Sequence, residues 1–124
     1  MAFYGLFNTN LENLLRDLVT AYPDIQELKR IKSAIILAKS INPKTPQKIF
    51  KTYVNDLYRT QIIAKDETFF LEKHSFDGVK ENYMGFIDII KMCWKDMDID
   101  NQNVVWKYMH ALIALSDKCC LKTT

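Results

Sequence analysis

The sequence contains few glycines and prolines, the residues that are common in chains with many tight turns. Its 124 residues include three glycines and three prolines. This scarcity argues against an all-β protein, and also against collagen-like or low-complexity sequence. The length suits a single domain built around one hydrophobic core.

Long apolar runs are also absent. No window approaches the roughly 20 apolar residues that cross a bilayer, so the sequence predicts no membrane span. The N-terminal stretch 1–7 has no basic segment and little apolar length, which argues against a signal peptide. The three cysteines are odd in number and two are adjacent. Without a secretory signal, they predict reduced thiols and an intracellular protein.

The spacings that support catalysis or metal binding are missing. His74 and His110 lie on different predicted elements, and Cys119 and Cys120 lack partners at zinc-ligand spacing. Three scattered glycines build neither a phosphate-binding loop nor a nucleophile elbow. We therefore expect no enzyme, no metal site and no cofactor.

Apolar side chains recur at helical spacing along most of the chain. The predicted helices cover about residues 10–22, 24–41, 45–64, 66–72, 82–95 and 101–118. A loop is expected at 73–81, and no strand-like alternation competes with the helices. We expect an all-α fold, a single compact irregular bundle of five to six helices. Its parts are an N-terminal arm at 1–9, a helical domain at 10–118 and a C-terminal tail at 119–124.

Several helix ends have recognisable signals. Thr9 and Glu12 have the spacing of a capping box at the start of the first predicted helix, and Pro23 is expected to end that helix. Asp24 is the candidate cap of the second helix and Thr45 that of the third.

The expected core is built from the large apolar residues of the periodic segments. The last predicted helix is apolar around most of its circumference, so we expect it to be central, with Trp106 as its packing centre. The predicted core residues are Leu15, Leu18, Tyr53, Phe70, Trp94, Trp106 and Leu112. In the second helix, Ile36 and Leu37 are expected to widen an apolar stripe formed by Ile25, Leu28, Ile31, Ile35 and Ala38.

An apolar stretch before the first predicted helix is the candidate partner-binding arm. Its side chains lie outside the amphipathic pattern of that helix, so they need another surface to cover them. They are Phe3, Tyr4, Leu6 and Phe7. Two interpretations stay open: the arm binds a partner, or it folds back over its own bundle.

Positive charge is concentrated in the first half of the chain. Residues 1–62 hold nine Lys and Arg against five acids, and the whole chain carries +2. A mildly basic face of the second and third helices would meet phosphates, although surface lysines solvate any helix. The candidate residues for weak nucleic-acid binding are Lys29, Arg30, Lys32, Lys48 and Lys51.

A set of short motifs occurs together in this chain. They are Ala21–Asp24, Ala34, Ile41–Lys44, Tyr53–Val54, Tyr58, Gln61–Ile62, Lys65–Leu71, Val105–Met109 and Leu112. In this combination the sequence resembles small all-helical proteins of nucleocytoplasmic large DNA viruses, the giant viruses of algae and amoebae. The resemblance covers about residues 8–118 and transfers no catalytic residue. It implies a viral origin, a location inside the infected host cell, and a role in the virion such as a minor capsid or internal protein.

Together these observations predict a non-enzymatic helical protein–protein interaction protein of a large DNA virus. It would be a virion or minor structural component, and its partners would be further copies of itself or capsid proteins. The alternative is a nucleic-acid-associated accessory protein that uses the mildly basic face of the first half.

Overall fold

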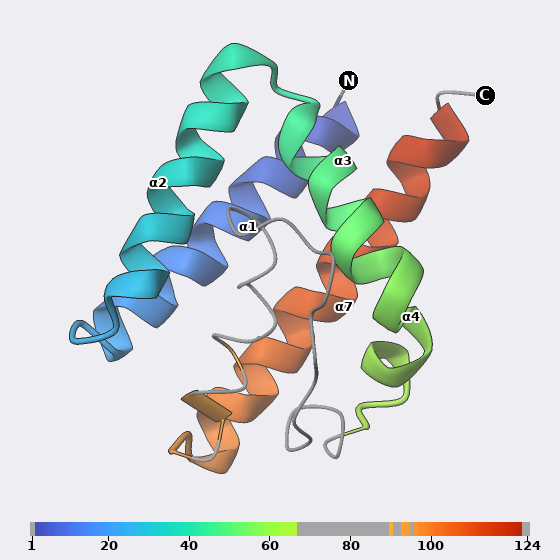
Figure 1. Cartoon of the computed structure of the whole chain (residues 1–124). Coiled ribbons are helices and arrows are strands. Elements are labelled where there is room, and N and C mark those ends of the chain that lie inside the picture. The colour runs from blue at the N-terminus through green and yellow to red at the C-terminus, as the bar shows by residue number, and fades with distance from the viewer. Residues whose placement is uncertain (1, 67–89, 91–92, 95, 123–124) are drawn as a thin grey trace.

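The structure, a computed structural model, describes residues 2–66, 90, 93–94 and 96–122. The secondary structure of this part of the chain is all-helical, which confirms the predicted all-α class, while the expected bundle of five to six helices stays a prediction (Figure 1). Its elements are α1 (Ala2–Ala21), α2 (Gln26–Ile41), α3 (Thr45–Phe50), the π-helical turn η1 (Lys51–Asn55), α4 (Asp56–Ile63) and α7 (Ile99–Lys122). The helix predicted at 66–72, the loop at 73–81 and most of the helix at 82–95 lie outside the described residues.

α1 begins at Ala2, which corrects the prediction of an arm at residues 1–9 ahead of the first helix. Tyr4 and Phe7 are buried and precede Leu11 at helical spacing, so the buried stripe of α1 extends back into its first turns. Thr9 therefore lies inside the helix, and the predicted capping box is wrong. The helix ends at Ala21, before Pro23, as predicted.

α2 packs against α1 through one face. Leu28, Ile35 and Ala38 are buried, whereas Ile36 and Leu37 are 41% and 62% exposed. The apolar stripe that Ile36 and Leu37 were predicted to widen is therefore covered only along Leu28, Ile35 and Ala38, and the two added residues remain exposed. The predicted cap Asp24 is also wrong: the N-cap is Ile25, and no side chain caps the helix.

A continuous helical segment follows, made of α3, η1 and α4. The N-cap of α3 is Lys44 rather than the predicted Thr45, and Pro46 lies in the first turn, where its missing N–H costs nothing.

The π-helical turn η1 was not predicted. After α4, Lys65 adopts φ 53°, and the N–H of Asp66 donates to the carbonyl of Gln61 at 2.9 Å. This is a Schellman ending with a lysine where glycine is usual.

α7 (Ile99–Lys122) is the longest described helix and shares the core with α1. It packs along α1 and also contacts α3, η1 and α4, while α2 lies on the other side of α1 (Figure 1). The side chain of Asp98 caps it, since Asp98 Oδ1 accepts the N–H of Asn101 at 2.8 Å. The Tyr108 hydroxyl donates to Asp17 Oδ2 at 2.9 Å and ties α7 to α1.

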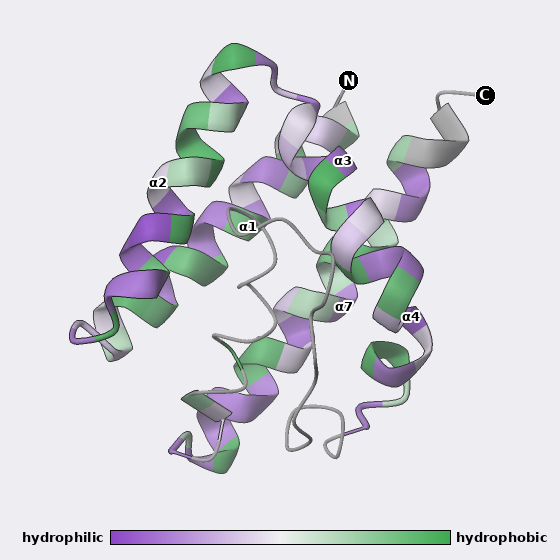
Figure 2. Cartoon of the chain, in the orientation of Figure 1, coloured by the Kyte–Doolittle hydropathy of each residue, from purple (hydrophilic) through white to green (hydrophobic). Residues whose placement is uncertain are grey.

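Most of the predicted core residues lie in the interior. Those that are buried are Leu15, Leu18, Trp94, Trp106 and Leu112. Tyr53 is half-buried and Phe70 lies outside the described residues. The rings of Trp94 and Trp106 meet edge to face with centroids 5.2 Å apart. Figure 2 shows apolar residues at the end of α2 that leads to α3, where Leu37 and Ile41 are 62% and 78% exposed. None of the helices in the described ranges has the length and apolar character to cross a membrane.

Candidate functional site

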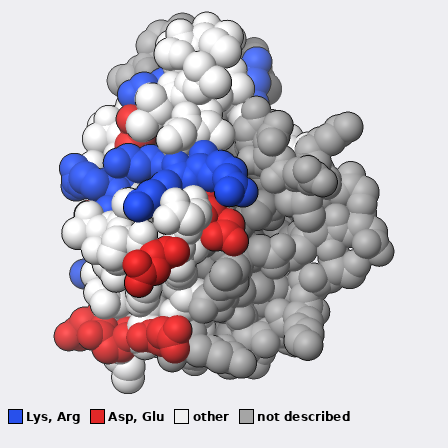
Figure 3. Space-filling view, turned by 60° about the vertical axis from the view of Figure 1, so that its left-hand side comes forward, with Lys and Arg blue, Asp and Glu red and all other residues white. Residues whose placement is uncertain are grey.

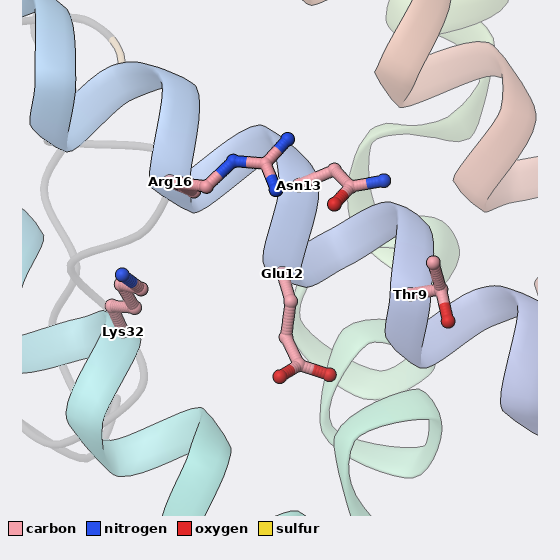
Figure 4. Close-up of a pocket in the computed structure, with 5 residues that line it drawn as sticks. All are labelled: Thr9, Glu12, Asn13, Arg16 and Lys32. Carbon is pink, nitrogen blue, oxygen red and sulfur yellow. The ribbon is translucent and has the colours of Figure 1, made fainter.

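A groove lies between α1 and α2 on the outside of the bundle. The buried leucines of α1 face the core, so the polar residues three and four positions apart on its opposite side line the groove, and α2 contributes Lys32. The cavity has a volume of about 300 Å³ and is lined by Thr9, Glu12, Asn13, Arg16 and Lys32. In Figure 4, Arg16 and Lys32 lie at one end of this α1–α2 groove and Thr9 at the other.

Positive charge dominates the groove and its α2 edge. Glu12 Oε2 is 2.8 Å from Lys39 Nζ, so the groove's carboxylate is already paired. Arg16 Nε is 3.6 Å from Asp17 Oδ1, a long contact between two exposed side chains. Within the described part of the chain, Lys29, Arg30 and Lys32 make no ion pair. These cations are therefore available to an anionic partner.

An apolar patch adjoins the groove on the outer face of α2. Ile36, Leu37 and Ile41, which we call the α2 ridge, are 41%, 62% and 78% exposed. They are exposed because α2 uses its opposite face to pack on α1. Figure 3 brings the α2 side forward and shows Lys and Arg gathered in a band, with mostly uncharged surface above it and uncharged surface mixed with several acids below it.

The structure separates the basic residues predicted from the sequence. Lys29, Arg30 and Lys32 lie in the first half of α2, whereas α3, which carries Lys48, begins beyond the opposite end of α2 (Figure 1). Lys51, at the start of η1, pairs with Asp56 at 3.0 Å. The five candidates do not form one basic face.

Arg16 contributes to the groove although it was not among the predicted site residues. The signal that pointed to it was the polar stripe Thr9, Glu12, Asn13 and Arg16, which follows helical spacing opposite the leucines of α1. Because α1 begins at Ala2, Thr9 lies inside the helix and extends this polar stripe by one turn.

The predicted partner-binding arm is largely covered by its own bundle. Phe7 is fully buried and Tyr4 is 6% exposed, with Lys44 Nζ 5.5 Å from its ring centroid. Phe3 is half-buried beside Lys118, and Leu6 is 51% exposed. Tyr4 and Phe7 are therefore not available to a partner, and partner binding stays a prediction for Phe3 and Leu6.

A largely buried polar cluster joins α3 and η1 to α7. The Ser116 hydroxyl donates to Gln47 Oε1 at 2.5 Å, and Asn55 Nδ2 donates to Ser116 Oγ at 3.2 Å and to Asp117 Oδ1 at 3.1 Å. Arg59 pairs with Asp117 at the surface end. These groups satisfy one another, so we interpret the cluster as a device that positions the helices.

The Cys93 thiol and the His110 imidazole lie in surroundings that favour a structural role rather than a chemical one. Burial, with a smaller effect of Asp96, raises the pKa of the Cys93 thiol to about 11, which keeps it protonated and unreactive near neutral pH. His110 Nε2 lies 2.7 Å from the Ile62 carbonyl oxygen and donates its proton there. No group of three or more His, Cys, Asp or Glu in the described ranges is arranged to hold a metal ion. His74 lies outside these ranges.

Comparisons with known protein families, with curated proteins and with solved structures gave no match. The resemblance to giant-virus proteins therefore stays a prediction. A functional interpretation depends on the α1–α2 groove and the α2 ridge themselves.

Proposed function

We propose that this chain is a non-enzymatic helical interaction protein that binds a protein partner through the outer face of α2. The observation that carries the proposal is the α2 ridge, where Leu37 and Ile41 are 62% and 78% exposed and Ile36 adjoins them. Single exposed apolar residues are ordinary, but several on the outer face of one helix, beside charged residues, are typical of a protein-binding surface.

The anchoring of α2 supports this function. Leu28, Ile35 and Ala38 hold its inner face in the core, so the outer face is presented on a rigid element. A rigid apolar helix face loses little conformational entropy on binding, which favours affinity. The neighbouring groove supplies the polar and charged rim.

Site-specific photo-crosslinking tests the proposal in the cells that naturally make the protein. A photoreactive residue at Leu37 is expected to form a discrete crosslink to a protein, and Ile41→Asp is expected to abolish it. The matched control is the same residue at Leu57, which is 54% exposed on α4. Identical products at both positions, or none at Leu37, would contradict the proposed function.

The viral part of the proposal rests on the sequence resemblance. For a protein of a large DNA virus, the partner would be a capsid protein or a further copy of the chain in the virion. Protein mass spectrometry of purified particles tests this part. The chain is expected among the particle proteins after protease treatment of the particle surface, and its absence there would exclude a virion role.

Weak nucleic-acid binding is the second candidate, and the unpaired Lys29, Arg30 and Lys32 favour it. If these residues contact phosphates, charge reversal of each should reduce the salt dependence of DNA affinity by about one unit of slope. Fluorescence anisotropy of labelled duplex DNA at two salt concentrations measures this. Affinity unchanged by the reversals would exclude this surface as the DNA site.

A further inference from the structure

We propose that the outer face of α1 and α2 recognises an acidic amphipathic helix. Such a partner has apolar side chains at one end of its contact face and Asp or Glu about two turns away. This inference rests on the proposed function and names the chemistry of the partner.

The arrangement of charge and apolar surface along α2 is the first argument. Arg30, Leu37 and Ile41 differ by seven and then four positions, so they lie along one row of the helix surface. Lys29 and Ile36 differ by seven positions and form a parallel row. Both rows are cationic near the start of α2 and apolar near its end, about 10 Å further on. A complementary helix therefore places Asp or Glu against Lys29 and Arg30 and apolar side chains against the α2 ridge.

The state of the neighbouring charges is the second argument. In the described part of the chain, the groove's carboxylate, Glu12, is paired with Lys39, whereas Lys29, Arg30 and Lys32 make no ion pair. Glu27 lies in the first turn of α2 and Asp24 just before the helix, at the opposite end from the ridge. Lys29, Arg30 and Lys32 lie between these two acids and the ridge, so they are free to pair with carboxylates of a partner.

The apolar ridge favours a helix over the other occupants. A phosphate backbone has no apolar surface with which to cover Leu37 and Ile41, and a basic helix would meet like charges at Lys29 and Arg30. A second copy of α2, laid antiparallel with ridge on ridge, would cover the ridge, but its acid Glu27 lies at the end of α2 far from the ridge and would not reach Lys29 and Arg30. The mode that satisfies both parts of the face is an amphipathic helix laid along α2.

Selection from a phage-displayed random library of peptides about 18 residues long, long enough for a helix of about 27 Å, tests the inference on the full chain. We expect enriched peptides to combine apolar residues at helical spacing with Asp or Glu two turns away. In anisotropy measurements with a labelled enriched peptide, Leu37→Asp and the pair Lys29→Glu with Arg30→Glu should each weaken binding at least about tenfold.

Two matched variants control for general effects of the substitutions. Leu57→Asp changes a leucine on α4 that is 54% exposed, against 62% for Leu37, and Lys48→Glu changes an exposed lysine on α3. Both are expected to leave peptide affinity unchanged. Circular dichroism establishes that each variant keeps the helical content of the parent, and a ridge variant that loses it is replaced by the milder Leu37→Ser.

Several outcomes would overturn the inference. They are enrichment of basic or uncharged peptides, failure to enrich any peptide, and peptide binding that is indifferent to Lys29 and Arg30. Tighter binding of labelled duplex DNA, unaffected by Leu37→Asp, would assign the face to nucleic acid. A dimer detected by light scattering and dissociated by Leu37→Asp would assign it to a second copy. A protein crosslink at Leu37 without any acidic preference would retain the proposed function and reject only this inference.

Discussion

The ring of Phe7 meets the ring of Phe50 edge to face, with centroids 5.2 Å apart and planes inclined by 70°. This contact ties the first turns of α1 to the end of α3. It places in the core a residue that the sequence pattern assigned to a partner-binding arm. The adjacent Leu6 is 51% exposed, so the two neighbours have opposite surroundings.

Alanine substitutions at these two positions should differ sharply. Phe7→Ala removes a fully buried ring and is expected to lower the free energy of unfolding by about 3–5 kcal/mol. Leu6→Ala is expected to change it by less than about 1 kcal/mol, since half of that side chain is already in water. Urea titrations measure both. Equal effects would mean that the first turns of α1 do not pack as described.

Trp106 is expected to be a packing centre rather than a binding residue. It is 5% exposed and packs edge to face on Trp94, so Trp106→Ala should cost about 3–5 kcal/mol. A domain of this length has a total stability of roughly 6–19 kcal/mol, so the loss is a large fraction of it. Val104→Ala, at a 42% exposed position of the same helix, is the control. A near-zero effect of Trp106→Ala on the urea midpoint would contradict the buried position of Trp106 on α7 against Trp94.

The buried hydroxyl of Ser116 should contribute through its two hydrogen bonds. Ser116→Ala leaves Gln47 Oε1 without its donor and Asn55 Nδ2 without one acceptor, and is expected to destabilise the protein by about 1–3 kcal/mol. Ser33→Ala, on the exposed side of α2, should be nearly neutral. Thermal unfolding compares the two, and equal midpoints would show that the cluster adds no stability.

Lys65 should be a position where glycine stabilises. A non-glycine residue at φ 53° is strained, so Lys65→Gly is expected to raise the free energy of unfolding by about 1 kcal/mol. Ala64 has φ −76°, which any residue adopts. Ala64→Gly should therefore lower the free energy of unfolding by about 0.5–1 kcal/mol, because glycine gives the unfolded chain more conformational freedom. Chemical denaturation of the two variants checks for opposite signs; the same sign for both would contradict the Schellman ending.

The buried thiol of Cys93 should make stability fall at alkaline pH. Burial raises its pKa from 9.0 to about 11, so the folded state holds the proton more tightly than the unfolded state. The resulting stabilisation is complete below pH 9 and is lost as pH rises from about 9 to about 11. Burial also raises the pKa values of Tyr22 and Tyr108, so the comparison is made with Cys93→Ala. That variant should show a shallower loss of stability over this range, and an identical pH profile would rule out the contribution of Cys93.

Local sequence information predicted the helical class and several helix ends. Apolar spacing identified most of each described helix, although not the first turns of α1, and Pro23 marked the end of α1. These features depend on residues within one or two helical turns of each other. The π-helical turn was not evident, because η1 has the same apolar spacing as the α-helical residues beside it.

Which apolar residues are covered depended on the tertiary structure. Periodicity shows that Phe7 and Leu37 each lie on an apolar helix face, but it does not show whether another helix packs there. Phe50 covers Phe7 from a distant part of the chain, whereas Leu37 lies on the side of α2 that faces away from α1.

The candidate site also depends partly on the sequence and partly on the tertiary structure. The sequence determined which residues carry charge and at what spacing along each helix. Only the packing of α2 against α1 brought Lys32 to Arg16 and left Leu37 and Ile41 on the outside. A groove between two helices depends on how their buried faces fit together, and that fit is a property of contacts between residues far apart in the sequence.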